Sequence, residues 1–123
     1  MLKSLSLQNF RNYKKSSFDF KDKSLIIIGP NTAGKSNLIE SIFLLSTGKS
    51  FRAEKDSQMV KIGHEMGKVS AKQSSGEPDL EVVVTVGEVA GVRVQFKRYF
   101  VNGVAKRRAD FVGNFPSVLF SPQ

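Results

Sequence analysis

Apolar and polar residues alternate in two short stretches near the amino terminus, residues 2–8 and residues 16–20. The apolar positions are leucines in the first stretch and phenylalanines in the second. Alternation of this kind puts every second side chain on one face of a strand, so both stretches predict half-buried strands. Residues 10–13 join them, and we expect the two strands to be antiparallel.

Two longer apolar patterns follow. Residues 25–28 are continuously apolar, which predicts a fully buried strand, and residues 35–46 carry apolar side chains at i, i+3, i+4 and i+7 spacing. The second pattern is typical of a helix that packs a wide apolar stripe on a sheet. Gly48 follows this helix and is a candidate C-cap.

The rest of the chain is rich in predicted strands. Residues 49–66 are mostly polar and predict a short helix or a turn, with an apolar patch at positions 59, 60 and 62. Further elements are predicted as strands at 68–73, 80–86 and 92–101, a hairpin turn at Asn102-Gly103, a short helix at 106–113 and a strand at 117–120. The strand at 92–101 is expected to place its residues 92, 94 and 96 on one face. Asn-Gly between apolar pairs is a strong signal for a type I′ hairpin.

The segment between the strand at 25–28 and the helix at 35–46 carries the most specific chemistry. It fits the pattern G-x-x-x-x-G-K-[ST] in the strand–loop–helix context that a phosphate-binding loop requires. Backbone N–H groups of such a loop converge on an anion, together with the positive end of the helix dipole. The lysine would reach the β- and γ-phosphates, and the serine hydroxyl would ligate Mg²⁺. The pattern therefore predicts a nucleoside triphosphate site at Gly29, Pro30, Asn31, Thr32, Ala33, Gly34, Lys35 and Ser36.

Composition narrows the class of protein further. The chain has 123 residues, of which 40% are hydrophobic and 24% charged, enough for one domain with a core. It has no cysteine, and its apolar runs are far shorter than the roughly 20 residues that span a bilayer. We expect a cytoplasmic protein without a membrane partner, and a solvated loop position for the single His64. The net charge of +8 favours a polyanionic partner, and a solvated basic surface is the alternative.

The second half of an ATP-hydrolysing site is missing. Hydrolysis in this class needs an apolar strand that ends in an Mg²⁺-binding Asp, with a carboxylate nearby to polarise water. No run of four apolar residues precedes an Asp in this sequence. The signature motif and the switch histidine of ABC ATPases are absent as well. We therefore expect the amino-terminal lobe of a longer ATPase, without a catalytic residue of its own, and a complete small binding module is the alternative.

Several motifs together resemble the RecF family, which belongs to the SMC-like heads of ABC ATPases. The matching stretches are L-x-x-F-R-N-Y, G-x-N-x-x-G-K-[ST]-N and L-I-E-S-I-F-L-L-S-T-G-K-S-F-R, followed by V-N-G, K-R-R-A-D-F-V-G and V-L-F-S-P. The resemblance covers the whole chain but only the amino-terminal part of a family member. It implies an α/β fold, the P-loop NTPase lobe of ABC/SMC-head type, as a single domain over residues 1–123. We expect a mixed sheet with few helices and an antiparallel β-rich portion around residues 68–104.

The resemblance also implies cofactors and partners. These are ATP and Mg²⁺, single-stranded or gapped duplex DNA, the proteins RecO and RecR, and an ATP-dependent homodimer of the intact protein. Arg11 and Asn12 match a basic segment that lies near the nucleotide in SMC-like heads. Gln123 stands where such heads place a glutamine that contacts Mg²⁺. Thr32 and Ala33 replace the Gly-Ser that is common in other ABC loops, which leaves a stiffer cradle.

Five basic residues that flank the Asn-Gly hairpin form the candidate DNA-binding set: Lys97, Arg98, Lys106, Arg107 and Arg108. They would contact the DNA backbone in a salt-dependent way. The alternative is a solvated hairpin rim whose charges block edge-to-edge strand pairing. Phe51, Tyr99 and Phe100 could stack on bases, although core packing is favoured for them. Glu40, one turn after Ser36, is expected to be a surface residue.

The sequence thus predicts the ATP-binding lobe of a RecF-like DNA replication, repair and recombination protein that binds DNA in an ATP-dependent way. Alone, the chain is expected to bind ATP–Mg²⁺ weakly and not to hydrolyse it. A basic P-loop module of another SMC-like ATPase is the nearest alternative. A small-molecule kinase would need a lid arginine and an acceptor pocket, and neither is discernible. A plain nucleic-acid-binding domain would bind DNA regardless of ATP.

Overall fold

The computed structural model of the chain describes residues 2–20 and 33–115, except for the side chains of residues 33–35. The strands predicted at 25–28 and 117–120 lie outside the described residues. The described strands form one six-stranded antiparallel sheet in the order β2-β1-β3-β4-β7-β8 and a separate ribbon of β5 and β6. Their bounds are β1 (Leu2–Phe10), β2 (Tyr13–Asp19), β3 (Met66–Gln73), β4 (Leu80–Thr85), β5 (Glu88–Val89), β6 (Val92–Arg93), β7 (Lys97–Val101) and β8 (Val104–Lys106).

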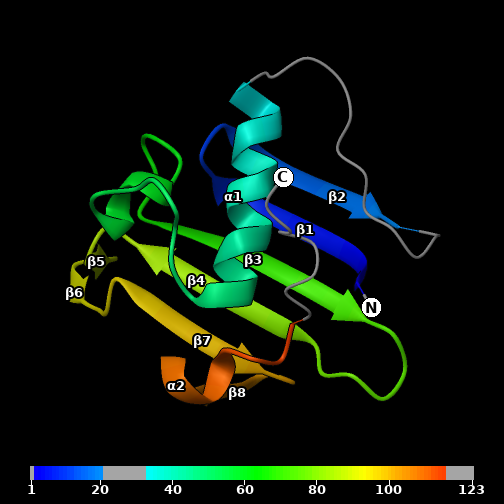
Figure 1. Ribbon diagram of the computed structural model, residues 1–123. Coiled ribbons are helices and arrows are strands. Elements are labelled where there is room, and N and C mark those ends of the chain that lie inside the picture. Colours follow the sequence, from blue (N-terminus) through cyan, green and yellow to red (C-terminus); the bar gives the residue numbers. More distant parts are fainter. Residues whose placement is uncertain (1, 21–32, 116–123) are drawn as a thin grey trace.

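Helix α1 (Ala33–Thr47) crosses one face of the sheet, as Figure 1 shows. A single 3₁₀ turn, η1 (Asp56–Met59), follows it, and the one-turn helix α2 (Arg108–Phe111) lies beside β7 and β8. The predicted helices at 35–46 and 106–113 are both present, although the second is shorter than expected. Neither described helix is long and apolar enough to cross a membrane.

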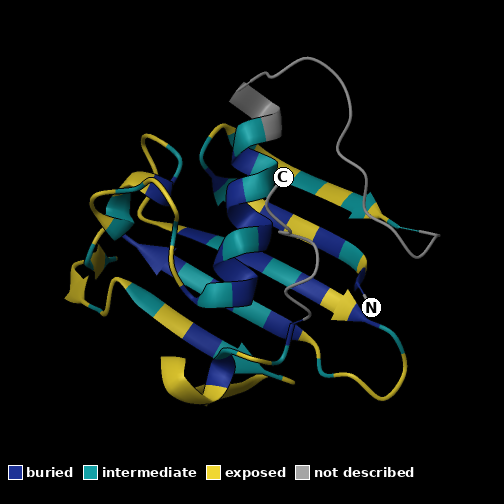
Figure 2. Cartoon of the chain, in the orientation of Figure 1, coloured by how far each residue is buried: buried dark blue, intermediate teal, exposed yellow. Residues whose placement is uncertain are grey.

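Alternation along the strands builds the core between the sheet and α1 (Figure 2). One row across the sheet runs from Leu7 through Val69 and Val82 to Tyr99, each opposite the next. All four side chains are buried, while Ser6 on the strand's other face is exposed. Helix α1 contributes Ile42, Leu44 and Leu45 to this core. Phe10, Met59, Phe111 and Phe115 are buried in the same cluster.

The end of β1 departs from regular alternation, and this departure positions the turn that follows. Asn9 has φ 48°, and Phe10, which comes after it at the wrong parity, is nevertheless fully buried. The N–H of Lys61 donates to the Asn9 carbonyl at 2.8 Å, and the N–H of Arg11 donates to the Met59 carbonyl at 2.9 Å. The residues just after η1 are thereby fastened to the β1–β2 turn, and Arg11, itself at φ 53°, is held over the helix.

The carboxy-terminal end of α1 is a polar anchor point. The predicted C-cap is confirmed, because Gly48 has φ 78° and its N–H donates to the Leu44 carbonyl at 2.8 Å. The Gly48 carbonyl accepts from the Tyr99 hydroxyl at 2.8 Å and from Lys97 Nζ at 3.1 Å. Arg108 donates through Nε and Nη2 to the Thr47 carbonyl. Carbonyl groups that the helix cannot satisfy internally are thus bonded by β7 and α2.

The prediction of one continuous strand over 92–101 is wrong. The structure has two strands there, β6 and β7, and the residues between them are bonded to the end of β4 and the turn after it by both backbone and side-chain groups. The Thr85 hydroxyl donates to the Gln95 carbonyl at 2.7 Å and accepts from the N–H of Gly87 at 3.0 Å. Val92 and Phe96, expected on one face of that strand, are 63% and 50% exposed. The Asn102-Gly103 hairpin is confirmed, with φ values of 51° and 80° and Val101 paired with Val104.

Candidate nucleotide site

Helix α1 begins at Ala33, inside the phosphate-loop motif, as a helix that presents its N-terminus to an anion requires. Gly29, Pro30, Asn31 and Thr32 lie outside the described residues, and so does Gln123. Ala33, Gly34 and Lys35 form the first turn of the helix backbone, and Ser36 is half-buried in the same turn. The described part of the predicted site is therefore the start of α1 together with the side chains that surround it.

One buried carboxylate lies at the centre of these side chains. Glu40 is 0% exposed and accepts from Arg11 in a fork, with Nε to Oε1 and Nη2 to Oε2 both at 2.7 Å. This two-bond geometry is the strongest that a carboxylate and a guanidinium form. The expectation that Glu40 is a surface residue is wrong. This helix position is buried because Arg11 and the segment after α1 both pack over it.

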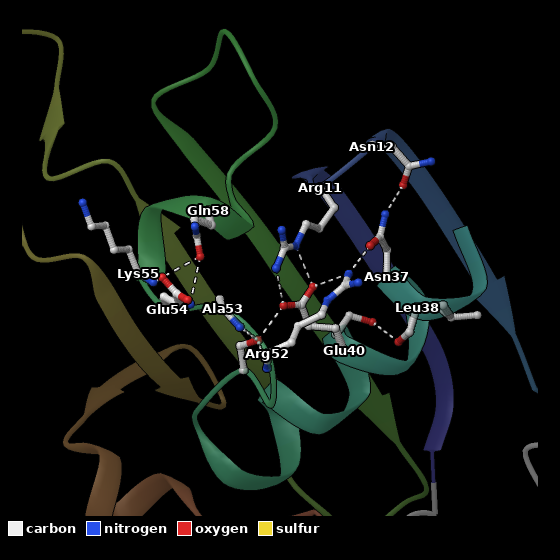
Figure 3. A network of polar contacts seen from close by, with 12 residues as sticks. Arg11, Asn12, Asn37, Leu38, Glu40, Arg52, Ala53, Glu54, Lys55 and Gln58 are labelled. Atoms are coloured by element: carbon white, nitrogen blue, oxygen red, sulfur yellow. Dashed lines mark hydrogen bonds and ion pairs between the residues drawn. The ribbon is translucent and has the colours of Figure 1, made fainter. Parts of the chain in front are cut away.

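Two residues after the helix complete the coordination of Glu40 (Figure 3). Arg52 Nη2 donates to Oε1 at 3.0 Å, and the Ser50 hydroxyl donates to Oε2 at 2.6 Å. Burial alone raises the pKa of the Glu40 carboxyl, but the hydrogen bonds from Arg11, Arg52 and Ser50 outweigh it and hold the pKa below its usual value. The carboxylate is therefore charged at neutral pH.

Two asparagines extend the network toward the turn. Asn37 Nδ2 donates to Asn12 Oδ1 at 2.6 Å, and Arg52 Nη2 donates to Asn37 Oδ1. Lys61 Nζ lies 3.5 Å from the Asn12 carbonyl. The structure thus brings the predicted residues Arg11 and Asn12 to within one helical turn of Ser36, in contact with α1 itself.

An open cleft of about 370 Å³ lies over this network. Its polar lining comes from Arg11, Asn12, Asn37, Arg52, Gln58 and Lys61. The side chains of Arg11 and Arg52 remain 22% and 35% exposed. Three cationic residues against the single carboxylate of Glu40 leave the cleft positively charged, which suits an anionic ligand.

Sequence reasoning missed Glu40, Ser50 and Arg52 as members of the site. The available signal was a glutamate within a mostly apolar helix stretch, four residues after the motif's serine. Its neighbours at Asn37, Ser41 and Leu44 are buried too, so α1 has a second buried face beside the predicted apolar stripe.

The five hairpin cations line one hollow of about 450 Å³ beside β7, β8 and α2. Two of them make bonds within the fold. Lys97 bonds the Gly48 carbonyl and Asp56, and Arg108 bonds the Thr47 carbonyl. Arg107 Nε lies 3.2 Å from Asp110 Oδ2 at an exposed position. Arg98 stacks over the Phe100 ring at 5.1 Å, and Lys106 is exposed.

The three aromatic candidates for stacking on bases differ in exposure. Tyr99 is a core residue at 8% exposure, as favoured from the sequence, and Phe100 is half-buried. Phe51 is 50% exposed and packs edge-on against Phe43 at 5.5 Å. His64 is exposed in a loop, as expected.

The antiparallel sheet, the helix that starts inside the motif and the basic cleft beside it define the phosphate-loop lobe of an ABC/SMC-type head. The chain belongs to the RecF/RecN/SMC N-terminal domain family, whose model matches residues 1–123. The resemblance to RecF is confirmed. The chain is 37% identical over 124 residues to the DNA replication and repair protein RecF of Clostridioides difficile, covering 99% of this chain and 32% of the relative. To RecF of Leptospira interrogans it is 36% identical over 121 residues, covering 98% and 33%.

Solved structures agree with the sequence relatives. The structure described as the recombination mediator protein RecF-ATPrS in the RecFOR pathway matches with a TM-score of 0.79 and 36% identity, over 99% of this chain and 32% of that chain. The corresponding RecF-ATP structure matches with a TM-score of 0.78, 36% identity, and coverage of 99% and 33%. The SMC head domain from Thermotoga maritima, at 24% identity and a TM-score of 0.65 over 89% and 40%, shares the fold. The chain spans about a third of the length of the RecF relatives it matches.

Proposed function

We propose that this chain is the ATP-binding lobe of a RecF-like DNA replication and repair protein. Residues 29–36 bind the triphosphate, Lys35 contacts the β- and γ-phosphates, and the Ser36 hydroxyl ligates Mg²⁺. The observation that carries the proposal is the start of α1 inside the motif, with the basic cleft of Arg11, Asn12 and Arg52 directly beside it. The RecF structures that match at 36% identity are described with ATP or ATPrS, which supports the same ligand here.

The residues around the cleft fit a triphosphate–Mg²⁺ ligand in both charge and donor type. Arg11, Arg52 and Lys61 supply positive charge, and the half-buried Ser36 supplies a hydroxyl oxygen, a ligand type that Mg²⁺ accepts. The bound Mg²⁺ neutralises phosphate charge, while these residues orient the phosphates and limit their access to water. Gln123 is a further Mg²⁺ contact in this proposal. Among the described residues, the carboxylate at the cleft is Glu40, which is fully buried and held by two arginines, so we expect this chain to bind ATP without turning it over.

The intact protein would act as an ATP-dependent homodimer in the cytoplasm. It would bind single-stranded or gapped duplex DNA and work with RecO and RecR in recombinational repair. The net charge of +8 and the basic hollow at the hairpin support the DNA component of this proposal. The residues proposed for DNA contact are Lys97, Arg98, Lys106, Arg107 and Arg108.

Calorimetry with ATP and Mg²⁺ tests the nucleotide site. The wild-type chain is expected to bind ATP weakly, and Lys35→Ala to weaken binding about 100-fold, since it removes a charge-assisted contact to phosphate that contributes roughly 1.5–3 kcal/mol. Lys72→Ala is the matched control, because Lys72 is an exposed lysine on β3. Absence of any binding heat from the folded wild-type protein would refute the proposal. ATP turnover that is abolished by Lys35→Ala would refute the claim that the chain is inactive alone.

A plain nucleic-acid-binding function is the second candidate, and the basic hollow favours it equally. It predicts DNA affinity that is the same with and without ATP. A titration of labelled gapped duplex in the presence and absence of ATP–Mg²⁺ separates the two. Tighter binding with ATP supports the RecF-like function, and identical curves support the plain DNA-binding domain.

A further inference from the structure

Two arginines from distant parts of the chain meet on one carboxylate. Arg11 comes from the β1–β2 turn and Arg52 from the segment after α1, and both donate to Oε1 of Glu40. Guanidinium groups this close repel each other, and each long side chain loses rotamer entropy when it is held in one place. A buried anion between them offsets both costs.

We propose that Glu40 is a positioning residue that holds Arg11 and Arg52 as a fixed pair of phosphate-binding groups over the cleft. The inference rests on the proposed ATP-binding function and deepens it. Glu40 contacts no ligand itself, because it is fully buried, and acts only through the two arginines.

The hydrogen-bond geometry leaves the arginines free to bind a second anion. The bonds to Glu40 use Nε and Nη2 of Arg11 and Nη2 of Arg52. A guanidinium carries more N–H donors than these, so each arginine keeps donors for a ligand. Both side chains remain partly exposed and line the 370 Å³ cleft. One carboxylate against two guanidinium groups also leaves a net positive charge, which would be lost if each arginine had its own acid.

Ser50 and Asn37 hold the pair from two further sides. The Ser50 hydroxyl satisfies Glu40 Oε2, and Asn37 Oδ1 accepts from Arg52. The same Ser50 oxygen accepts from the N–H of Arg52 at 3.0 Å and of Ala53 at 2.9 Å, so the segment that carries Arg52 is fastened at its start. Positions of phosphate-binding groups that are fixed before binding cost less entropy when the ligand arrives.

The test compares Glu40→Gln with Glu54→Gln, which removes the same charge from an exposed glutamate two residues beyond Arg52. Calorimetry with ATP–Mg²⁺ is the readout of positioning, and the melting temperature is the readout of stability. Glu40→Gln is expected to weaken ATP affinity about 10- to 100-fold, as removal of an outer-shell partner does for metal ligands. Glu54→Gln is expected to leave the affinity unchanged. In an Arg52→Ala background, the effect of Glu40→Gln on affinity should shrink, because half of the positioned pair is already gone.

Equal ATP affinity of folded Glu40→Gln and wild type would overturn the inference, and a change in melting temperature alone would mean that Glu40 is only structural. Tighter ATP binding by Glu40→Gln would also overturn it, since Glu40 would then compete with phosphate for the arginines. If Glu40→Gln does not fold, Glu40→Asp keeps the charge but shortens its reach, and a weakened affinity supports the inference while an unchanged one overturns it. Failure of the wild-type protein to bind ATP would refute the proposed function. This outcome is distinguishable from failure of the Glu40 inference, because it is seen in the wild-type protein before any variant is compared.

Discussion

A charged side chain inside a protein is stable only when its partners replace the water it has lost. Glu40 meets this condition with donors from Arg11, Arg52 and Ser50. Removal of one member of such a group leaves the others unpaired, which is costly even where the intact pair adds little net stability. The stability of the fold should therefore depend on the charge state of Glu40.

Glu40→Gln should lose stability at neutral pH but little in acid. The hydrogen bonds hold the folded-state pKa of Glu40 below the unfolded value of about 4.3. Their contribution is therefore fully present above that pH and is lost as pH falls through the folded-state pKa. We expect wild type to exceed Glu40→Gln by about 2–3 kcal/mol in the free energy of unfolding at pH 6, and by less at pH 3.

Urea denaturation of both proteins at several pH values measures this difference. Ser50→Ala serves as the control, because it removes a neutral donor but keeps the titrating carboxyl, so it retains acid dependence. A difference between wild type and Glu40→Gln that stays constant from pH 6 to pH 3 would contradict the prediction.

Gly67→Ala should destabilise the fold because the backbone of β1 leaves no room for a methyl group. A Cβ at Gly67 would lie 2.4 Å from the carbonyl oxygen of Asn9, which is backbone and cannot rotate away. We expect a loss of about 2–3 kcal/mol in unfolding free energy, the range of strongly overpacked sites. Gly76→Ala is the comparison, since a Cβ there meets nothing within 4 Å and only the φ of 91° opposes it, at about 1 kcal/mol. Equal losses, measured by denaturation, would mean that the contact with Asn9 relaxes freely.

At the scale of elements, α1 is fastened to the sheet at its carboxy-terminal end by polar contacts as well as by its apolar face. The Gly48 carbonyl accepts from Tyr99 and Lys97 of β7, and Tyr99 also packs on Phe111 of α2 with ring centroids 5.1 Å apart. One residue of β7 thus links three elements. These contacts fix where the helix ends, and hence the direction from which it presents its N-terminus.

Tyr99→Phe should cost about 1 kcal/mol of unfolding free energy, the typical value of a buried neutral hydrogen bond. The Lys97 ammonium still satisfies the Gly48 carbonyl in this variant, which keeps the loss small. Tyr99→Leu also removes the ring contact with Phe111 and should cost about 1 kcal/mol more. Thermal denaturation of the two variants separates hydroxyl from ring, and equal losses would show that the ring contact with Phe111 adds nothing.

At the scale of the whole molecule, two hollows lined by basic side chains lie on different parts of the fold. One is the cleft over Glu40, and the other is the hairpin hollow lined by the five cations of β7, β8 and the start of α2. Lys97 and Arg108 of the hairpin group are tied to the end of α1. Arg108 is exposed as well but is held by that bond, so a DNA backbone could most easily reach the exposed Arg98, Lys106 and Arg107.

The triple change of Arg98, Lys106 and Arg107 to glutamine should weaken DNA binding and its dependence on salt. Each phosphate contact adds about 0.7–0.9 to the slope of log affinity against log salt, so the slope should fall by about 2–3. Fluorescence anisotropy with gapped duplex from low to moderate salt measures it. Lys72→Gln is the control, because Lys72 is an exposed lysine on β3 outside the proposed DNA-binding set and should leave the salt slope nearly unchanged. An unchanged slope in the triple variant would place DNA contact elsewhere.

The sequence by itself determined the local elements and the phosphate-loop motif. Strands such as β3 and β4, helix α1 with its Gly48 cap and the Asn102-Gly103 hairpin were all predicted, because each depends on residues two to four positions apart. Arg11 and Asn12 were identified through the family resemblance. The break between β6 and β7 was missed, because it depends on Thr85 bonds to a segment ten residues away.

Only the tertiary structure decided the surroundings of the motif. Glu40 meets Arg11 across 29 residues of chain and Arg52 across 12. No local pattern reveals such contacts, since a glutamate on a helix is equally consistent with a solvated face. Which cations bond to the fold was also decided by packing, because Lys97 and Arg108 find their carbonyl partners at the end of a helix about 50–60 residues earlier. Local periodicity depends on neighbours along the chain, whereas the pairing of buried charges depends on how the elements come together.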